Sequence, residues 1–182
     1  YKGMEDLASE LSKIFALALQ LPINYFENKM DHHMSALRLV HYYPLRLRER
    51  KAAAAAADSS DDGRMGQQQQ QKQQRRLVRA GAHSDYGAFT ILNAGSPGLQ
   101  VRVRTNGTQA AASQDDADNN YYWHSVPVVP GALVINLGDL IQRWTNDEWV
   151  STLHRVAMPA TDAMERRYSI AYFVNVNGDT VI

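Results

Sequence analysis

The first twenty residues place apolar side chains three and four positions apart, with charged residues such as Glu10 and Lys13 on the other faces. The recurring apolar positions are Leu7, Leu11, Ile14, Phe15, Ala18 and Leu19. This period predicts an amphipathic helix that buries one stripe. We expect the helix to end near Leu21, because Pro22 cannot continue it. A short second helical piece is expected to start over residues 24–26.

Short alternating segments follow the helix. Residues 37–43 (LRLVHYY) alternate apolar and polar positions before Pro44, as a half-buried strand does. After Leu77 the pattern is β throughout, with turn residues between the segments. The further expected strands cover residues 89–92, 99–104, 121–124, 133–137, 150–157 and 168–175. Many short strands separated by turns predict a mainly β fold with flanking helices, arranged as a sandwich or barrel.

Residues 46–76 interrupt this pattern. They contain six consecutive alanines (52–57), several aspartates and a run of five glutamines (67–71). The segment has almost nothing to bury, so we interpret it as a low-complexity, disordered insertion. Residues 105–120 are polar and alanine-rich, and are interpreted as a second, shorter surface insertion.

The domain organisation follows from these boundaries. We expect an N-terminal helix and first core strand over residues 1–45, the insertion over 46–76, and the core over 77–182. Tyr1 already lies close to the helical pattern, and Ile182 directly follows a strand-like segment. We therefore interpret the chain as a fragment of a longer protein, truncated at its C-terminal end.

Composition excludes several classes of function. Lys and Arg number 19 and so do Asp and Glu, so no net charge draws the chain to nucleic acid or an anionic membrane. No stretch approaches the roughly 20 apolar residues of a membrane span, and no secretory signal is visible. We therefore expect a cytoplasmic protein without nucleic-acid or membrane partners. The sequence contains no cysteine, so any metal must be held by nitrogen and oxygen.

Two histidines and an aspartate are the candidate metal ligands. His83 and Asp85 are two residues apart, so in an extended segment both side chains project to one face. Alone, this pair also fits a surface loop with a histidine–aspartate hydrogen bond. His154 adds a second imidazole from a later predicted strand, which matches the facial triad of non-haem Fe(II) oxygenases. Zinc hydrolases use the same ligand types, so the triad alone leaves the metal open.

Arg167 and Ser169 are a candidate carboxylate site. They too are two residues apart in a predicted strand, which places a guanidinium and a hydroxyl on one face. A dicarboxylic oxo-acid could chelate the metal with one end and place its distal carboxylate there. Tyr43 could supply a further hydroxyl from the early strand. By itself, however, the Arg-x-Ser spacing also fits an exposed salt-bridging arginine.

Six segments between residues 37 and 173 together carry a family resemblance. In chain order they are LRLVHYYP, HSDYGAFTILN, SPGLQVRV, VPGALVINLGDLIQRWTND, WVSTLHRV and RYSIAYF. In these motifs and their order the chain resembles the 2-oxoglutarate/Fe(II)-dependent dioxygenases related to isopenicillin N synthase, which include many plant enzymes. The resemblance implies a double-stranded β-helix, or jelly-roll, core.

The resemblance also implies roles for the candidate residues. The iron ligands and catalytic centre it implies are His83, Asp85 and His154. Arg167 and Ser169 would hold the distal carboxylate of 2-oxoglutarate. The tyrosine that many members place before a proline falls on Tyr43, which is then a third co-substrate contact.

Two departures from the family pattern concern this carboxylate site. The asparagine of the family's N-x-Y-P segment is His41 here, so its role is open. The spacing from His154 to Arg167 is slightly longer than usual, which keeps Arg166 as a second candidate for the anion-binding arginine.

The function implied is hydroxylation or desaturation of a small molecule by Fe(II), 2-oxoglutarate and O2, with release of succinate and CO2 and with ascorbate as an auxiliary reductant. A 2-oxoglutarate-independent Fe(II) oxidase of the same superfamily is one alternative. A zinc hydrolase with the same ligands is another, although no general base is evident near the triad. The third is a non-catalytic binding module that uses the glutamine-rich insertion. The prime substrate and the oligomeric state are not identified.

Other polar residues are assigned plainer roles. Asn136, Gly138 and Asp139 are interpreted as a structural turn between two strands, because glycine and aspartate suit tight turns. His124 is interpreted as a polar residue on a strand face. Phe89, Ile91, Leu133 and Ile135 are expected in the core.

Overall fold

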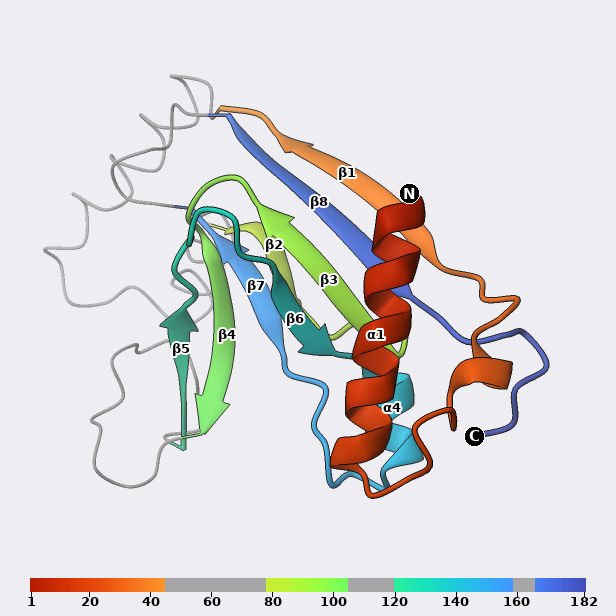
Figure 1. Ribbon diagram of the computed structural model, residues 1–182. Coiled ribbons are helices and arrows are strands. Elements are labelled where there is room, and N and C mark those ends of the chain that lie inside the picture. Colours follow the sequence, from red (N-terminus) through yellow and green to blue (C-terminus); the bar gives the residue numbers. More distant parts are fainter. Residues whose placement is uncertain (45–77, 105–119, 159–165) are drawn as a thin grey trace, which may run out of the picture.

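The computed structural model describes residues 1–44, 78–104, 120–158 and 166–182. Two four-stranded antiparallel sheets form its core (Figure 1). Sheet A contains, in spatial order, β1 (Ala36–Tyr42), β8 (Arg167–Val174), β3 (Phe89–Ala94) and β6 (Val134–Leu137). Sheet B contains β2 (Val78–His83), β7 (His154–Ala157), β4 (Leu99–Arg104) and β5 (Tyr121–Ser125). The segment 46–76 lies outside the described residues, as does 105–119.

The chain crosses between the sheets almost at every step. Strands β1, β3, β6 and β8 belong to sheet A, and the strands between them belong to sheet B. Each strand therefore pairs mostly with strands that are distant in sequence, as in β1 with β8, where Ala36 lies opposite Phe173 and Tyr42 opposite Arg167. This alternation between two antiparallel sheets confirms the expected mainly β, jelly-roll fold.

The helices lie outside the sheets. Helix α1 (Lys2–Ala18) runs across the face of sheet A, and the short 3-10 helix η1 (Glu27–Lys29) and helix α4 (Asp139–Trp144) lie near one end of it (Figure 1). Helix α1 ends three residues earlier than expected, before Gln20 adopts a positive φ of 58°. Within the described ranges, no helix is long and apolar enough to cross a bilayer.

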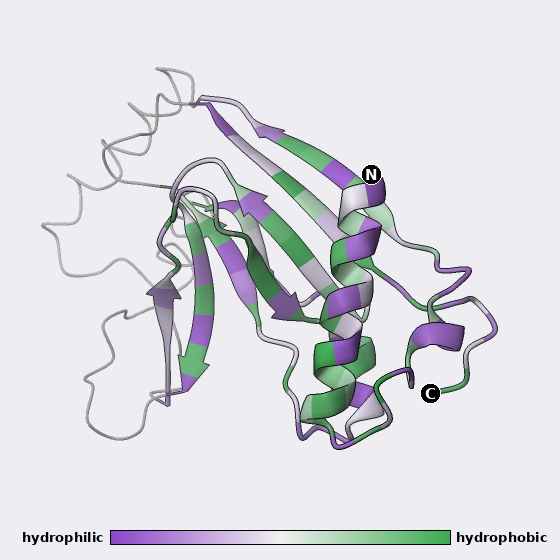
Figure 2. Cartoon of the chain, viewed as in Figure 1, coloured by the Kyte–Doolittle hydropathy of each residue, from purple (hydrophilic) through white to green (hydrophobic). Residues whose placement is uncertain are grey.

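The buried core lies between α1 and sheet A. Helix α1 contributes Ala8 and Ala16 to this core, and strands β3 and β8 contribute Phe89, Ile91, Tyr172 and Val174. Phe26 and Ile141 complete it from outside the sheets. Phe15 of α1 packs edge-on against Phe89, with ring centroids 5.1 Å apart, a contact of about 0.5–1.5 kcal/mol beyond the buried area. Figure 2 shows apolar and polar residues alternating along α1, and also along β4 of sheet B. The core expectation is confirmed for Phe89 and Ile91, and Ile135 packs against the core while only partly buried. It is wrong for Leu133, which precedes β6 and is 39% exposed.

Three elements differ from the sequence prediction. The sequence does not predict strand β2, because its residues VRAGAH offer little of the apolar alternation that marks a strand. Helix α4 forms where a turn is expected, with Asp139 in its first turn and Gly138 as its N-cap. Strand β7 starts at His154, because the preceding Ser151 donates its backbone N–H to Gln142 of α4 instead of to a neighbouring strand.

Candidate metal centre

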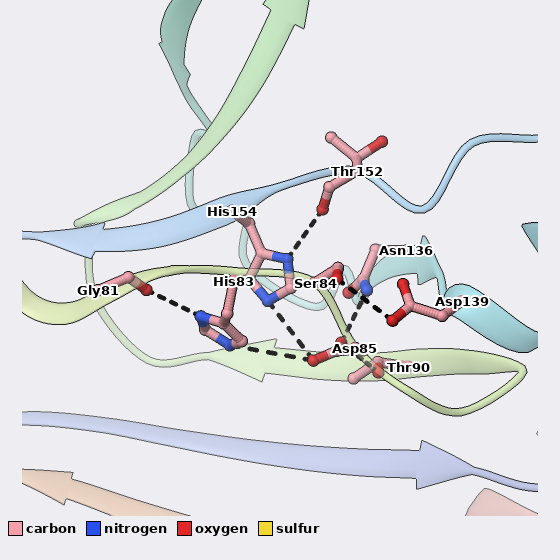
Figure 3. Close-up of polar contacts among 9 residues, drawn as sticks. All are labelled: Gly81, His83, Ser84, Asp85, Thr90, Asn136, Asp139, Thr152 and His154. Atoms are coloured by element: carbon pink, nitrogen blue, oxygen red, sulfur yellow. Dashed lines mark hydrogen bonds and ion pairs between the residues drawn. The ribbon is translucent and has the colours of Figure 1, made fainter. Parts of the chain in front are cut away.

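The three predicted metal ligands meet at one end of sheet B. His83 is the last residue of β2, His154 is the first residue of β7, and Asp85 follows in the loop after β2. His83 lies directly opposite His154 in the ladder, and their ring centroids are 4.3 Å apart (Figure 3). One ligand atom from each of the three residues lies within 4.8 Å of the others. The structure thus brings His83, Asp85 and His154 together from separate parts of the chain.

Both imidazoles are oriented by backbone carbonyls. His83 Nδ1 lies 2.8 Å from the carbonyl oxygen of Gly81, and His154 Nδ1 lies 3.1 Å from that of Thr152. A carbonyl only accepts hydrogen bonds, so each Nδ1 is placed to donate, and in the neutral imidazole the lone pair is then on Nε2. The Nε2 atoms face Asp85 Oδ1, at 4.0 Å from His83 and 3.6 Å from His154. This orientation is typical of metal-binding histidines.

Asp85 completes the ligand set as a buried carboxylate, with only 6% of the residue exposed. Burying a carboxylate is costly unless it is hydrogen-bonded and paired with positive charge. Two side chains, Thr90 and Asn136, donate hydrogen bonds to Oδ2, while Oδ1 faces the two histidines. Two neutral imidazoles and one carboxylate oxygen therefore fit a divalent cation, and the set suits Fe(II) or Zn(II).

The segment Asn136 to Leu140 holds the loop that carries Asp85. The backbone N–H of Asp139 donates to the carbonyl of Asp85 at 2.7 Å, and that of Gly138 donates to Ala88 at 2.9 Å. A Cβ on Gly138 would overlap the carbonyl oxygen of Gly87 and lie 2.9 Å from that of Asp85. Gly138 and Asp139 have a structural role, as expected, although at the start of a helix instead of in a turn. Their partner is the loop that carries Asp85, which lies far earlier in the sequence and which no local pattern reveals.

Arg167 points into the protein from the start of β8. It is 1% exposed, whereas its neighbour Arg166 is exposed. Its Nε donates to the carbonyl of Pro97 at 3.2 Å, and its Nη1 is buried without a hydrogen-bond partner in the described part of the chain. Burial lowers the pKa of the Arg167 guanidinium, and the positive charge of Arg79 lowers it further. A buried cation with a free donor fits an anionic group of a ligand.

The turn before β4 shapes the space around Arg167. Gly98 has a φ of +124°, a conformation that residues with a side chain rarely adopt. A Cβ there would lie 2.9 Å from the carbonyl of Ala157 and 3.7 Å from Arg167 Nε. Glycine at this position therefore lets the turn present the Pro97 carbonyl to the guanidinium.

Of the other predicted carboxylate contacts, the structure places Ser169 beside Arg167 and Tyr43 apart from it. Ser169 is buried on the same face of β8 as Arg167. Tyr43 lies beyond the end of β1, is 73% exposed and contacts His41, with ring centroids 4.2 Å apart. Its neighbour Tyr42 lies opposite Arg167, whose Cζ is 5.0 Å from the Tyr42 ring centroid. Sequence reasoning misses Tyr42, because the choice between adjacent tyrosines depends on the pairing of β1 with β8.

His124 belongs to the same cross-strand row as the metal-ligand histidines. Val101 of β4 lies opposite His154 on one side and His124 of β5 on the other. Two strand spacings of about 4.8 Å separate His124 from His154, with Val101 between them, and the three clustered ligand atoms come from His83, Asp85 and His154. His124 is exposed on its strand, as expected from the sequence.

Comparison with known proteins gives a consistent result. The profile of the 2OG-Fe(II) oxygenase superfamily matches residues 37–176. The 2-oxoglutarate-dependent dioxygenase htyE of Aspergillus rugulosus is 30% identical over 192 residues, covering all of this chain and 46% of htyE. The proline hydroxylase buaE of Petromyces alliaceus is also 30% identical, covering all of this chain and 47% of buaE.

Solved structures agree with these matches. The crystal structure of a full-length Neurospora crassa protein in complex with alpha-KG superposes with a TM-score of 0.69 at 30% identity, covering 97% of this chain and 44% of the Neurospora protein. The chain spans less than half the length of these relatives. The profile match covers most of the chain, including both histidines, Asp85 and the Arg167–Ser169 pair. The chain belongs to the 2OG-Fe(II) oxygenase superfamily.

Proposed function

We propose that this chain acts as an Fe(II)- and 2-oxoglutarate-dependent dioxygenase that oxidises a small molecule, by hydroxylation or desaturation, with release of succinate and CO2. The observation that carries the proposal is the convergence of His83 Nε2, His154 Nε2 and Asp85 Oδ1 on one space. The buried, partly unpaired guanidinium of Arg167 adds a place for a carboxylate. Together these features match the two ligands, metal and oxo-acid, that the superfamily's chemistry requires.

Within this proposal the ligand residues have distinct tasks. Bound Fe(II) would supply the oxygen chemistry, while His83, Asp85 and His154 hold the metal. Arg167 and Ser169 would bind the distal carboxylate of 2-oxoglutarate, with the Tyr42 ring against the guanidinium. Because Arg167 is almost fully buried, a bound carboxylate would be attracted in a low-dielectric environment and poorly screened by water.

The relatives' names support a small-molecule substrate. The relative buaE is named as a proline hydroxylase, and one structure of the Neurospora crassa protein contains thymine together with alpha-KG. Arg167 and Ser169 favour 2-oxoglutarate dependence over the zinc hydrolase, which leaves a buried carboxylate site without a use. They favour it only moderately over the co-substrate-free oxidase, because a related pair can bind another anion. Ascorbate as an auxiliary reductant, a cytoplasmic location and the lack of nucleic-acid or membrane partners remain predictions from the sequence.

Anaerobic titration of the protein with Fe(II) and then 2-oxoglutarate tests the proposal. A visible metal-to-ligand charge-transfer band is expected in the wild type. His154→Ala should abolish the band and Arg167→Ala should weaken it, whereas the matched control Arg166→Ala should leave it unchanged, because Arg166 is exposed. Absence of the band in wild-type protein that binds Fe(II) would instead support the co-substrate-free oxidase. Absence of any metal binding by folded protein would sink the proposal.

A further inference from the structure

The two carboxylate oxygens of Asp85 have different surroundings (Figure 3). Oδ1 faces the histidines, at 3.6 Å from His154 Nε2 and 4.0 Å from His83 Nε2. Oδ2 accepts hydrogen bonds from Thr90 Oγ1 at 2.6 Å and from Asn136 Nδ2 at 2.8 Å. A carboxylate oxygen offers two lone-pair sites, so these two donors saturate Oδ2. Only Oδ1 is left to face a metal.

Thr90 and Asn136 form a matched pair of donors. They lie directly opposite each other on β3 and β6, so the backbone ladder of sheet A fixes their spacing. Thr90 is 3% exposed, which leaves water little access to replace its bond to Asp85. The histidines come from sheet B, whereas both donors come from sheet A. Sheet A therefore fixes the orientation of the Asp85 carboxylate, whereas sheet B carries the two histidines. Both sheets are rigid elements, which suits a precisely positioned site.

We infer that Thr90 and Asn136 are positioning residues that restrict Asp85 to coordination of the metal through one oxygen. The inference rests on the proposed function. A metal bound by two imidazoles and one carboxylate oxygen would keep positions available for both 2-oxoglutarate and O2. Coordination by both oxygens of Asp85 would take up one of these positions. Rotation of the carboxylate into that arrangement would break both bonds to Oδ2, where burial leaves water little access to replace them.

A purely structural role for the two bonds is less consistent with the rest of the loop. The backbone of the Asp85 loop is already anchored by the N–H groups of Gly138, Asp139 and Leu140, which donate to Ala88, Asp85 and Gly87. The bonds from Thr90 and Asn136 are directed at the second carboxylate oxygen alone. They determine how the carboxylate is turned, whereas the backbone bonds determine where the loop lies.

The test uses Zn(II), which undergoes no redox chemistry, and protein labelled with 13C at the aspartate carboxyl carbon. Infrared difference spectra of metal-loaded and metal-free protein report the separation of the two carboxylate stretching bands, which is wide for one-oxygen and narrow for two-oxygen coordination. Calorimetry then measures 2-oxoglutarate binding to the Zn(II) form. The variants are Thr90→Val, which keeps the side-chain shape without the donor, and Thr90→Val combined with Asn136→Leu. Thr90→Ser is the rescue variant, since it keeps the hydroxyl.

A wide band separation is expected in the wild type, in Thr90→Ser and in the control Ser84→Ala, which removes only a 3.3 Å bond to Asp139. The double variant should show a narrow separation and bind 2-oxoglutarate about tenfold more weakly, or about 1.4 kcal/mol. A wide separation in the folded double variant, or a narrow one in the wild type, overturns the inference and leaves the proposed function standing. If the double variant does not fold, the band separation is compared between Thr90→Val and the wild type instead. A wide separation in Thr90→Val, or a narrow one in the wild type, then overturns the inference. Failure of wild-type protein to bind any metal removes the proposed function itself.

Discussion

Tyr42 lies directly opposite Arg167 in the β1–β8 ladder, with its ring centroid 5.0 Å from the guanidinium carbon. The relationship favours Tyr42 over Tyr43 as the tyrosine of the proposed carboxylate site, because successive side chains of a strand point to opposite faces. Tyr43 is correspondingly exposed.

Exchanging each tyrosine for leucine tests this assignment. Tyr42→Leu removes the ring beside a buried cation, a contact of about 2 kcal/mol when desolvated, and should weaken 2-oxoglutarate binding by roughly tenfold or more. Tyr43→Leu is the matched control and should leave the affinity within about twofold of wild type, as surface substitutions usually do. Calorimetric titration of 2-oxoglutarate into metal-loaded protein measures both. The opposite ranking of the two variants would return the role to Tyr43.

Arg167→Met separates stability from ligand binding. The guanidinium is buried with Nη1 unpaired among the described residues, so the wild type bears a desolvation cost that methionine does not. The lost bond to the Pro97 carbonyl and the lost cation–π contact with Tyr42 partly offset this gain, while the methionine side chain can still pack against the Tyr42 ring. We expect the unfolding free energy of the ligand-free variant, measured in urea, to be equal to that of the wild type or higher by about 1 kcal/mol.

The same variant should lose its response to the co-substrate. With metal present, 2-oxoglutarate should raise the melting temperature of the wild type, because a ligand that binds only the folded state stabilises it by mass action. Arg167→Met should show no such rise. A large drop in the ligand-free stability of Arg167→Met would instead assign Arg167 a structural role.

The spacing of two residues is what makes the candidate site visible in the sequence. Arg167 and Ser169 lie in one strand, where alternation places both on one face. His83 ends β2 and Asp85 lies in the loop after it, and the short extended connection still brings both to one place. Thr90, Asn136 and Tyr42 cannot be found in this way. Thr90 and Asn136 contact a loop residue, Asp85, and Tyr42 contacts Arg167 on a distant strand. Which residues meet in this way depends on strand register and on packing of the whole sheet. Strand β2 escapes prediction for a related reason, since pairing with β7 and not its own composition makes it a strand.

Gly138→Ala is expected to weaken metal binding, although it leaves the three metal-ligand residues His83, Asp85 and His154 unsubstituted. The added methyl group would overlap the carbonyl oxygen of Gly87 and crowd that of Asp85, so the loop that carries Asp85 must shift. Changes to the groups that position a metal ligand typically cost about 10–100-fold in metal affinity, and we expect a loss of about that size by competition titration with a chromophoric chelator. Gly81→Ala is the matched control, because a Cβ there meets nothing within 4 Å. Equal affinity of both variants would contradict the role assigned to the Gly138 contact.

Asp85→Asn should weaken metal binding and, at the same time, keep or raise the stability of the metal-free protein. In the absence of a cation, the Asp85 carboxylate is a buried negative charge, and its side-chain donors Thr90 and Asn136 contact Oδ2. An amide of the same shape can keep its oxygen toward these donors and removes the charge, so the desolvation cost falls. We expect chemical unfolding of the chelator-treated variant to give a free energy equal to or about 1 kcal/mol above that of wild type. Added Zn(II) should reverse the order, because it stabilises only the form that binds it. Stabilisation of Asp85→Asn by Zn(II) to the wild-type extent would show that the metal is held elsewhere.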